Sequence, residues 1–146
     1  MTKQPQWLDN AVFYEIYPQS FKDTNGDGIG DLKGVIRHLD KIEKLGANVI
    51  WLCPVFASPM VDNGYDISDY MDIDPSFGTM EDMKELIEEA KKRGIRVMLD
   101  GVFNHTGRKS VYFNADGFYP GLGAAQGEQS PYYRWYNFHP FPDEYD

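Results

Sequence analysis

NVIWLCPVF, residues 48–56, is a continuous apolar run, and it decides the fold class. Strands that are covered on both faces in a parallel sheet have this composition, because helices pack on each side of them. Two further runs, AVFYEIYP at residues 11–18 and IRVMLDGVFN at residues 95–104, are predicted as strands from their aromatic and branched side chains. The sequence therefore predicts three strands.

Two amphipathic segments separate these strands. The first runs over residues 32–45, and Gly46 is placed to close it in a left-handed cap. In the second, Thr79 and Asp82 can form a capping box, and Gly94 ends the helix. The apolar stripes comprise Val35, Ile36, Leu39, Ile42 and Leu45 in the first helix and Met83, Leu86, Ile87 and Ala90 in the second. Right-handed crossovers turn this order of elements into an α/β fold with a parallel sheet.

The composition excludes several classes of protein. A chain of 146 residues that is 42% hydrophobic and 15% aromatic is expected to be globular. The formal charge of -9 disfavours nucleic acid or an anionic membrane as the main partner. Cys53 is the only cysteine, which excludes an internal disulfide. We find no signal peptide or membrane span in the sequence and expect a cytoplasmic protein.

Oxygen-bearing side chains occupy alternate positions in DTNGDGIGD, residues 23–31. Positions one, three, five and nine are Asp23, Asn25, Asp27 and Asp31, with Gly28 at six and the Ile29 carbonyl at seven. This pattern predicts a cradle for calcium or magnesium, although Gly34 at position twelve excludes a regulatory EF-hand. In the alternative interpretation, Asp31 caps the following helix and the other acids form a solvated turn.

Two later loops are candidates for a sugar site, because ligands of α/β folds bind beyond the carboxyl ends of the strands. DNGYDISDY, residues 62–70, combines carboxylates with tyrosines, which suit sugar hydroxyls and the apolar face of a pyranose; a simple turn is the alternative. The third predicted strand ends in DGVFNH, where Asp100, Val102 and Asn104 are expected to share a face next to His105. A structural role for His105 is the alternative there. After it, residues 106–146 lose all periodicity and are expected to pack against the sheet.

Six segments in sequence order carry a resemblance to a known family: AVFYEIYPQSF, DTNGDGIGDL, GANVIWLCPVF, DNGYDISDY, FGTMEDMKEL and DGVFNHT. Over residues 7–107 the chain resembles the start of the catalytic barrel of the alpha-amylase family of glycoside hydrolases, most closely oligo-1,6-glucosidases and related α-glucosidases. The tail, residues 119–146, is similar to the start of the inserted second domain in cyclomaltodextrinases and neopullulanases.

The resemblance implies a role for each matching residue. Tyr65 would stack on the sugar at the cleavage subsite, His105 would bond its primary hydroxyl, and Asp100 would support the catalytic floor. Asp62 matches an acid of branches that cut from a chain end, and Asn104 matches a motif asparagine that serves a second metal in some members. The implied calcium ligands are Asp23, Asn25, Asp27, the Ile29 carbonyl and Asp31.

The resemblance also implies what lies elsewhere. Residues 1–105 would be the first three strand and helix units of a (β/α)8 TIM barrel, and residues 106–146 the start of the inserted domain; a complete barrel takes about 250 residues. The family's retaining hydrolysis of α-glucosidic bonds in malto- or isomalto-oligosaccharides uses a nucleophilic Asp and an acidic Glu from later strands. We therefore expect an inactive fragment that partners the remainder of the barrel, or other copies, through open sheet edges. A non-catalytic calcium- and sugar-binding module is the alternative.

Overall fold

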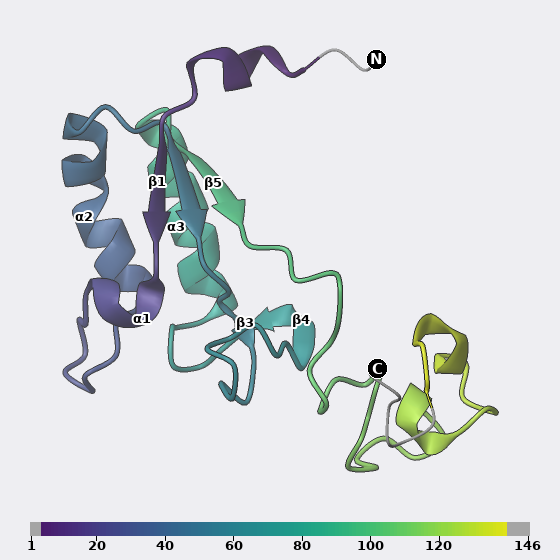
Figure 1. The fold of residues 1–146 in the computed structure, drawn as a ribbon. Helices are drawn as coiled ribbons and strands as arrows, with labels where there is room; N and C mark the ends of the chain where they lie inside the picture. The colour runs from purple at the N-terminus through teal and green to yellow at the C-terminus, as the bar shows by residue number, and fades with distance from the viewer. Residues whose placement is uncertain (1–3, 140–146) are drawn as a thin grey trace, which may run out of the picture.

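A computed structural model describes residues 4–139 and contains a three-stranded parallel sheet with two long helices packed against it (Figure 1). The strands are β1 (Phe13–Ile16), β2 (Val49–Leu52) and β5 (Arg96–Leu99), in the order β1-β2-β5. The helices are α2 (Leu32–Lys44) and α3 (Met80–Lys92), each of which follows one strand and precedes the next. This arrangement confirms the predicted order of strands and helices and the parallel sheet.

Both long helices begin and end where the sequence predicts. At the start of α2, the Asp31 carboxylate accepts a hydrogen bond of 2.7 Å from the Gly34 N–H. Thr79 and Asp82 form the reciprocal capping box of α3. Gly46 and Gly94 follow the two helices with φ of 84° and 69°, a left-handed conformation that glycine adopts without strain.

The hydrophobic core lies between these helices and the sheet. Its central side chains are Val35, Leu39 and Ile42 from α2, Met83, Leu86 and Ala90 from α3, and Ile50 and Leu52 from β2. Two residues of the predicted stripes lie outside it: Leu45 is 68% exposed and Ile87 is 46% exposed. Leu45 follows the end of α2, and Ile87 is turned about 100° from Leu86 around α3, so the buried stripes are narrower than predicted.

The strands are shorter than the apolar runs that predicted them. The run at residues 48–56 divides, because β2 ends at Leu52 and residues 56–57 form β3 (Phe56–Ala57) in a second sheet. The partner of β3 is the antiparallel strand β4 (Asp69–Ile73), in a stretch for which no strand was predicted. Because β4 contains two aspartates, Asp69 and Asp72, it has no continuous apolar run that would predict a strand. Similarly, β5 ends at Leu99 instead of residue 104.

The segment after His105 contains short 3-10 turns and no strand within residues 106–139. These turns are η2 (Ala124–Gln126) and η3 (Tyr133–Trp135). The segment joins the rest of the fold through Gly107, whose N–H donates to the Ile67 carbonyl at 2.8 Å. Directly before it, the His105 carbonyl accepts from the Tyr70 hydroxyl of β4. The segment therefore adjoins the small sheet, rather than the three-stranded sheet against which we expected it to pack. The predicted inserted domain extends to residue 146, and residues 140–146 lie outside the described part.

Two further elements complete the described chain. The 3-10 helix η1 (Gln6–Asn10) precedes β1, and the short helix α1 (Pro18–Phe21) follows it. No helix among residues 4–139 is long and apolar enough to cross a membrane.

Candidate functional site

The carboxyl ends of β1, β2 and β5 lie at one edge of the sheet, and the loops with the predicted site residues start there (Figure 1). The sheet hydrogen bonds continue one residue beyond the strands. Cys53 N–H donates to the Ile16 carbonyl at 2.9 Å, and Asp100 N–H donates to the Leu52 carbonyl at 3.0 Å. The backbone at both positions is thereby fixed relative to the sheet, which gives the loops a rigid base.

Three of the predicted site residues lie together. The Tyr65 hydroxyl donates to Asp100 Oδ2 at 2.9 Å, and His105 Nε2 lies 3.0 Å from the Tyr65 carbonyl oxygen. Because a carbonyl only accepts, His105 Nε2 carries the proton of this bond, and in the neutral ring Nδ1 is the acceptor. Residues from two loops, far apart in the sequence, thus form one polar group with an exposed imidazole.

The Tyr65 phenol is held in its neutral form. Burial is the largest cause that raises the pKa of Tyr65 to about 12, and the hydrogen bond to Asp100 and the negative charge of that residue raise it further. At neutral pH the hydroxyl is therefore a donor to Asp100, and the aromatic ring carries no charge. An uncharged ring with a fixed hydroxyl suits the apolar face of a sugar.

Tyr70 holds the loop that carries His105. Its hydroxyl lies 2.9 Å from the carbonyl oxygens of both Val102 and His105. Residues 100–105 lie beyond the end of β5, so the strand alternation that we expected to place Asp100, Val102 and Asn104 on one face does not apply. Val102 is buried and Asn104 is exposed. The sequence pattern had included Tyr70 in the candidate loop 62–70 but had not indicated this role, because the role depends on the unpredicted strand β4.

Asp62 does not join the group formed by Tyr65, Asp100 and His105. Its side chain is exposed, and its backbone N–H donates to Asp66 Oδ1 at 3.1 Å. Asp66 also accepts from the Ser58 hydroxyl at 2.8 Å, and Asn63 has φ of 52°, so the turn interpretation of this loop holds around Tyr65. Burial would raise the pKa of Asp66, but hydrogen bonds from the Asp62 backbone and the Ser58 hydroxyl keep it below its ordinary value.

The acidic side chains of loop 23–31 bind the loop's own backbone. Asp23 accepts from the N–H groups of Asn25, Gly26 and Gly28, and these bonds, with that of Gly26 the largest, lower the pKa of Asp23. Asp27 accepts from the Ile29 N–H at 2.7 Å. These contacts hold residues 23–29 in a turn.

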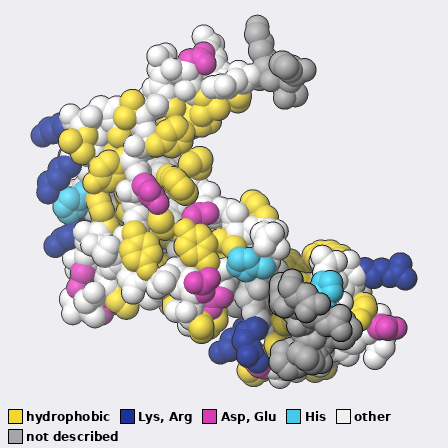
Figure 2. Space-filling view, in the orientation of Figure 1, with side chains coloured by type: hydrophobic (Ala, Val, Ile, Leu, Met, Phe, Trp, Pro, Cys, Tyr) yellow, Lys and Arg dark blue, Asp and Glu magenta, His cyan; other side chains and the backbone are white. Residues whose placement is uncertain are grey.

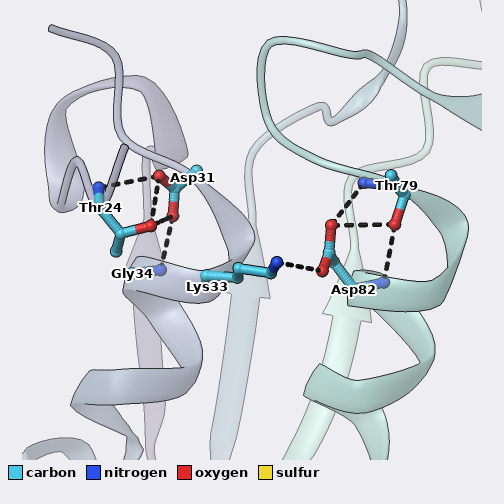
Figure 3. A network of polar contacts seen from close by, with 6 residues as sticks. All are labelled: Thr24, Asp31, Lys33, Gly34, Thr79 and Asp82. Atoms are coloured by element: carbon cyan, nitrogen blue, oxygen red, sulfur yellow. Dashed lines mark hydrogen bonds and ion pairs between the residues drawn. The ribbon is translucent and has the colours of Figure 1, made fainter. Parts of the chain in front are cut away.

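Asp31 has two structural roles in this region. Besides capping α2, its carboxylate accepts from the Thr24 N–H and hydroxyl at 2.9 Å each (Figure 3). Near it, Lys33 and Asp82 form an ion pair of 3.5 Å that links the starts of α2 and α3 (Figure 3). One buried carboxylate thus ties the loop to the helix.

The loop retains the donors that a hard cation requires. Three carboxylates, one carboxamide and the Ile29 carbonyl supply oxygen ligands of the kind that calcium takes. Among residues 4–139, however, no three acidic, imidazole or thiol side chains are grouped as a metal site would require. The residues therefore fit a cation by chemistry, and binding would require some carboxylate oxygens to turn from backbone N–H groups toward the ion.

Comparisons with known proteins identify the family. The model of the alpha-amylase catalytic domain matches residues 15–144. Trehalose-6-phosphate hydrolase of Escherichia coli (strain K12) is 50% identical over 136 residues, which cover 93% of this chain and 23% of that enzyme. Oligo-1,6-glucosidase of Bacillus sp. (strain F5) is 58% identical over 108 residues, which cover 74% of this chain and 21% of that enzyme.

Solved structures agree with the sequence matches. The crystal structure of Bacillus licheniformis trehalose-6-phosphate hydrolase superposes with a TM-score of 0.81 at 49% identity, covering 91% of this chain and 22% of that one. The chain spans about a quarter or less of the length of these relatives. With a family model that matches nearly the whole described chain, and with the motif order and fold found above, this chain belongs to the alpha-amylase family, where it corresponds to the amino-terminal part of the catalytic domain.

Proposed function

We propose that this chain is the sugar-binding, amino-terminal part of a retaining α-glucosidase-type glycoside hydrolase. The observation that carries the proposal is the group of Tyr65, Asp100 and His105 at the carboxyl ends of the parallel strands. A neutral aromatic ring, an oriented carboxylate and an exposed imidazole are what a glucose ring requires for stacking and for hydrogen bonds from its hydroxyls. Relatives named as oligo-1,6-glucosidases and as trehalose-6-phosphate hydrolase support an α-glucoside as the substrate class.

In this proposal the chain binds and orients the sugar but does not cleave it. Retaining hydrolysis requires a nucleophilic carboxylate and an acidic carboxyl group about 5 Å apart on opposite sides of the reacting bond. Tyr65 would hold the sugar ring, and His105 Nδ1 would accept from one of its hydroxyls. Positioning groups alone lower the barrier little, because the chemistry is supplied by the carboxylate pair. We therefore propose that the 146 residues alone hydrolyse no α-glucoside, and that malto- or isomalto-oligosaccharides are substrates of the complete barrel.

Sugar binding to the 146-residue chain tests this function directly. Saturation-transfer NMR with isomaltotriose should show contact with aromatic protons of the wild-type protein, and Tyr65→Ala should remove that contact. Tyr119→Ala is the matched control, because Tyr119 is exposed and lies in the segment after His105. Equal transfer in the wild type and Tyr65→Ala would reject the site. Turnover of a nitrophenyl α-glucoside by the pure chain would reject the proposal that the 146 residues bind the sugar without hydrolysing it.

We also propose that loop 23–31 binds calcium, or alternatively magnesium. The oxygen donors of the loop support this proposal, and the ion would order the loop at the start of α2 without taking part in a reaction step. The expected cytoplasmic location stays a prediction, which fractionation of the source cells would test.

The open sheet suggests further partners. Hydrophobic side chains gather on the face of the three-stranded sheet that the helices leave uncovered (Figure 2). Glu15, Trp51 and Met98 are neighbours in register there, and Phe13 of β1 is 45% exposed. We propose that the remainder of a barrel covers this face, and that isolated copies associate through it.

A further inference from the structure

The aromatic side chains in and around the turn η3 divide into two sets, and the proposed function uses neither. In a 3-10 turn, residues three apart lie above one another, and Trp135 N–H donates to the Tyr132 carbonyl at 3.0 Å. Tyr132 and Trp135 therefore lie on one side of the turn, with ring centroids 5.0 Å apart. Tyr133 stacks instead on Phe138, with centroids 4.8 Å apart, and belongs to the other set.

The set that contains Phe138 holds the turn in place. Phe113 stacks on Phe138 with centroids 6.4 Å apart, and it packs against Tyr136 at 5.1 Å. The hydroxyls of Tyr136 and Thr106 form a hydrogen bond of 2.7 Å, and Thr106 directly follows His105. These contacts connect η3 to the loop of the candidate site, so the other set stands on a fixed base.

The other set consists of Tyr112, Tyr132 and Trp135, and it holds the indole with one face open. Trp135 stacks on Tyr112 with centroids 5.4 Å apart and an angle of 29° between the rings. Tyr132 packs edge-on with both, at 5.1 Å from Tyr112 and 5.0 Å from Trp135. Because the three distances are nearly equal, both tyrosines lie on the same side of the indole; rings on its two opposite faces would lie much farther from each other. Trp135 is 65% exposed despite these two contacts, so its other face is open to solvent.

We propose that the open face of Trp135 is a second binding surface for a glucose ring of an oligosaccharide, separate from the group around Tyr65. A flat, uncharged aromatic ring with one open face suits the apolar face of a pyranose. Because Tyr112 and Tyr132 already fix the indole, little side-chain entropy is lost when the sugar binds. The choice of an α-glucoside as the ligand rests on the proposed function, whereas the ring geometry is independent of it.

The indole N–H signals in 15N-correlated NMR spectra test this surface. The chain has three tryptophans, Trp7, Trp51 and Trp135, and Trp135→Phe assigns the signal of interest. Maltotriose and isomaltotriose at millimolar concentrations should each shift the Trp135 signal saturably and leave the Trp7 signal in place. Mannitol, which has hydroxyls but no ring, should shift neither. A Trp135 signal that neither trisaccharide moves would overturn the inference.

Variants of the supporting ring show whether the stacked geometry matters. Tyr112→Ala removes the ring on which Trp135 stacks and should raise the Kd for maltotriose several-fold, whereas Tyr112→Phe keeps the ring and should bind as the wild type does. Phe118→Ala is the matched control, because Phe118 is 66% exposed in the same segment and belongs to neither set. Equal Kd values in Tyr112→Ala and Phe118→Ala would contradict the proposed surface. So would a Trp135 signal that moves on dilution without sugar, because the open face would then be a contact between copies.

The variant Tyr65→Ala separates the two surfaces. It leaves Trp135 and both supporting tyrosines intact, so the shift of the Trp135 signal should persist with the Kd of the wild type. Loss of the shift in Tyr65→Ala would show one site rather than two and would overturn the inference. In Trp135→Ala, saturation transfer to isomaltotriose reports on Tyr65, so a failure there rejects the proposed function and leaves the Trp135 result standing.

Discussion

Replacing Asp31 by alanine separates the structural role of loop 23–31 from any role in metal binding. The Asp31 carboxylate is 6% exposed and accepts hydrogen bonds from Gly34 N–H, Thr24 N–H and the Thr24 hydroxyl. Losing an N-cap costs about 1 kcal/mol. Leaving the partly buried Thr24 groups without an acceptor costs about 1–2 kcal/mol more. Asp31→Ala should therefore lower the free energy of unfolding by about 2–3 kcal/mol, a large share of the ~5–15 kcal/mol typical of a domain.

Urea unfolding in EGTA, followed by circular dichroism at 222 nm, measures this loss in the absence of calcium. With a denaturant slope of about 2 kcal/mol per molar urea, the midpoint should fall by about 1 M or more. Asp27→Ala is the matched control, because Asp27 is exposed in the same loop and accepts only from Asn25 and Ile29. Asp31→Asn keeps one acceptor oxygen and should lie between the two. If Asp31→Ala destabilises the chain no more than Asp27→Ala does, the carboxylate does not tie the loop to α2.

Three further predictions concern calcium, acid and association. Calcium should raise the melting temperature of the wild type by binding only the folded loop, and Asp27→Ala should abolish that rise; no heat of binding at millimolar calcium would leave the loop a simple turn. Burial would raise the pKa of Asp82, but Thr79 and Lys33 hold it below its ordinary value, so its stabilisation is complete above about pH 5 and is lost as pH falls through the folded-state pKa. Asp82→Asn should therefore unfold more easily at pH 7 and lose less stability between pH 7 and pH 3, whereas the exposed Glu81→Gln should follow the wild type. Light scattering should show concentration-dependent association of the wild type, and Phe13→Lys on the uncovered face should reduce it; a strictly monomeric wild type would contradict the exposed sheet.

The order of strands and helices could be predicted because the buried positions are regular. Leu39 and Leu86 are both fully buried at the centres of their helices, and the capping residues lie where the helical spacing starts. The strand β4 could not be predicted, since Asp69 and Asp72 interrupt the apolar signal while its partner β3 has only two residues. The periodicity of apolar residues indicates which side chains are buried. It does not indicate a strand such as β4, whose side chains are mostly exposed and which pairs through its backbone.

The candidate site was predictable in its residues but not in its geometry. Tyr65 and His105 belong to loops at the same end of the sheet, which the order of elements already implied. Their contact depends on Tyr70, whose hydroxyl fixes the backbone of residues 102–105, and no spacing rule indicates such a bond. The position of Asp62 was not predictable for a related reason: its backbone N–H donates to Asp66 in a turn, and the sequence does not show this bond.

The buried Asn114 gives the segment after His105 its own internal support. Its carboxamide donates to the carbonyls of Tyr119 and Leu122 at 2.8 and 2.7 Å, and its backbone carbonyl accepts from the Gln126 side chain. All these partners lie within residues 114–126, so their hydrogen bonds are local. We therefore expect this segment to unfold and refold locally as a separate cooperative unit, without unfolding of the sheet. Residues of this segment could therefore be exchanged as a unit, while the hydrogen bonds that hold Tyr65 stay unchanged.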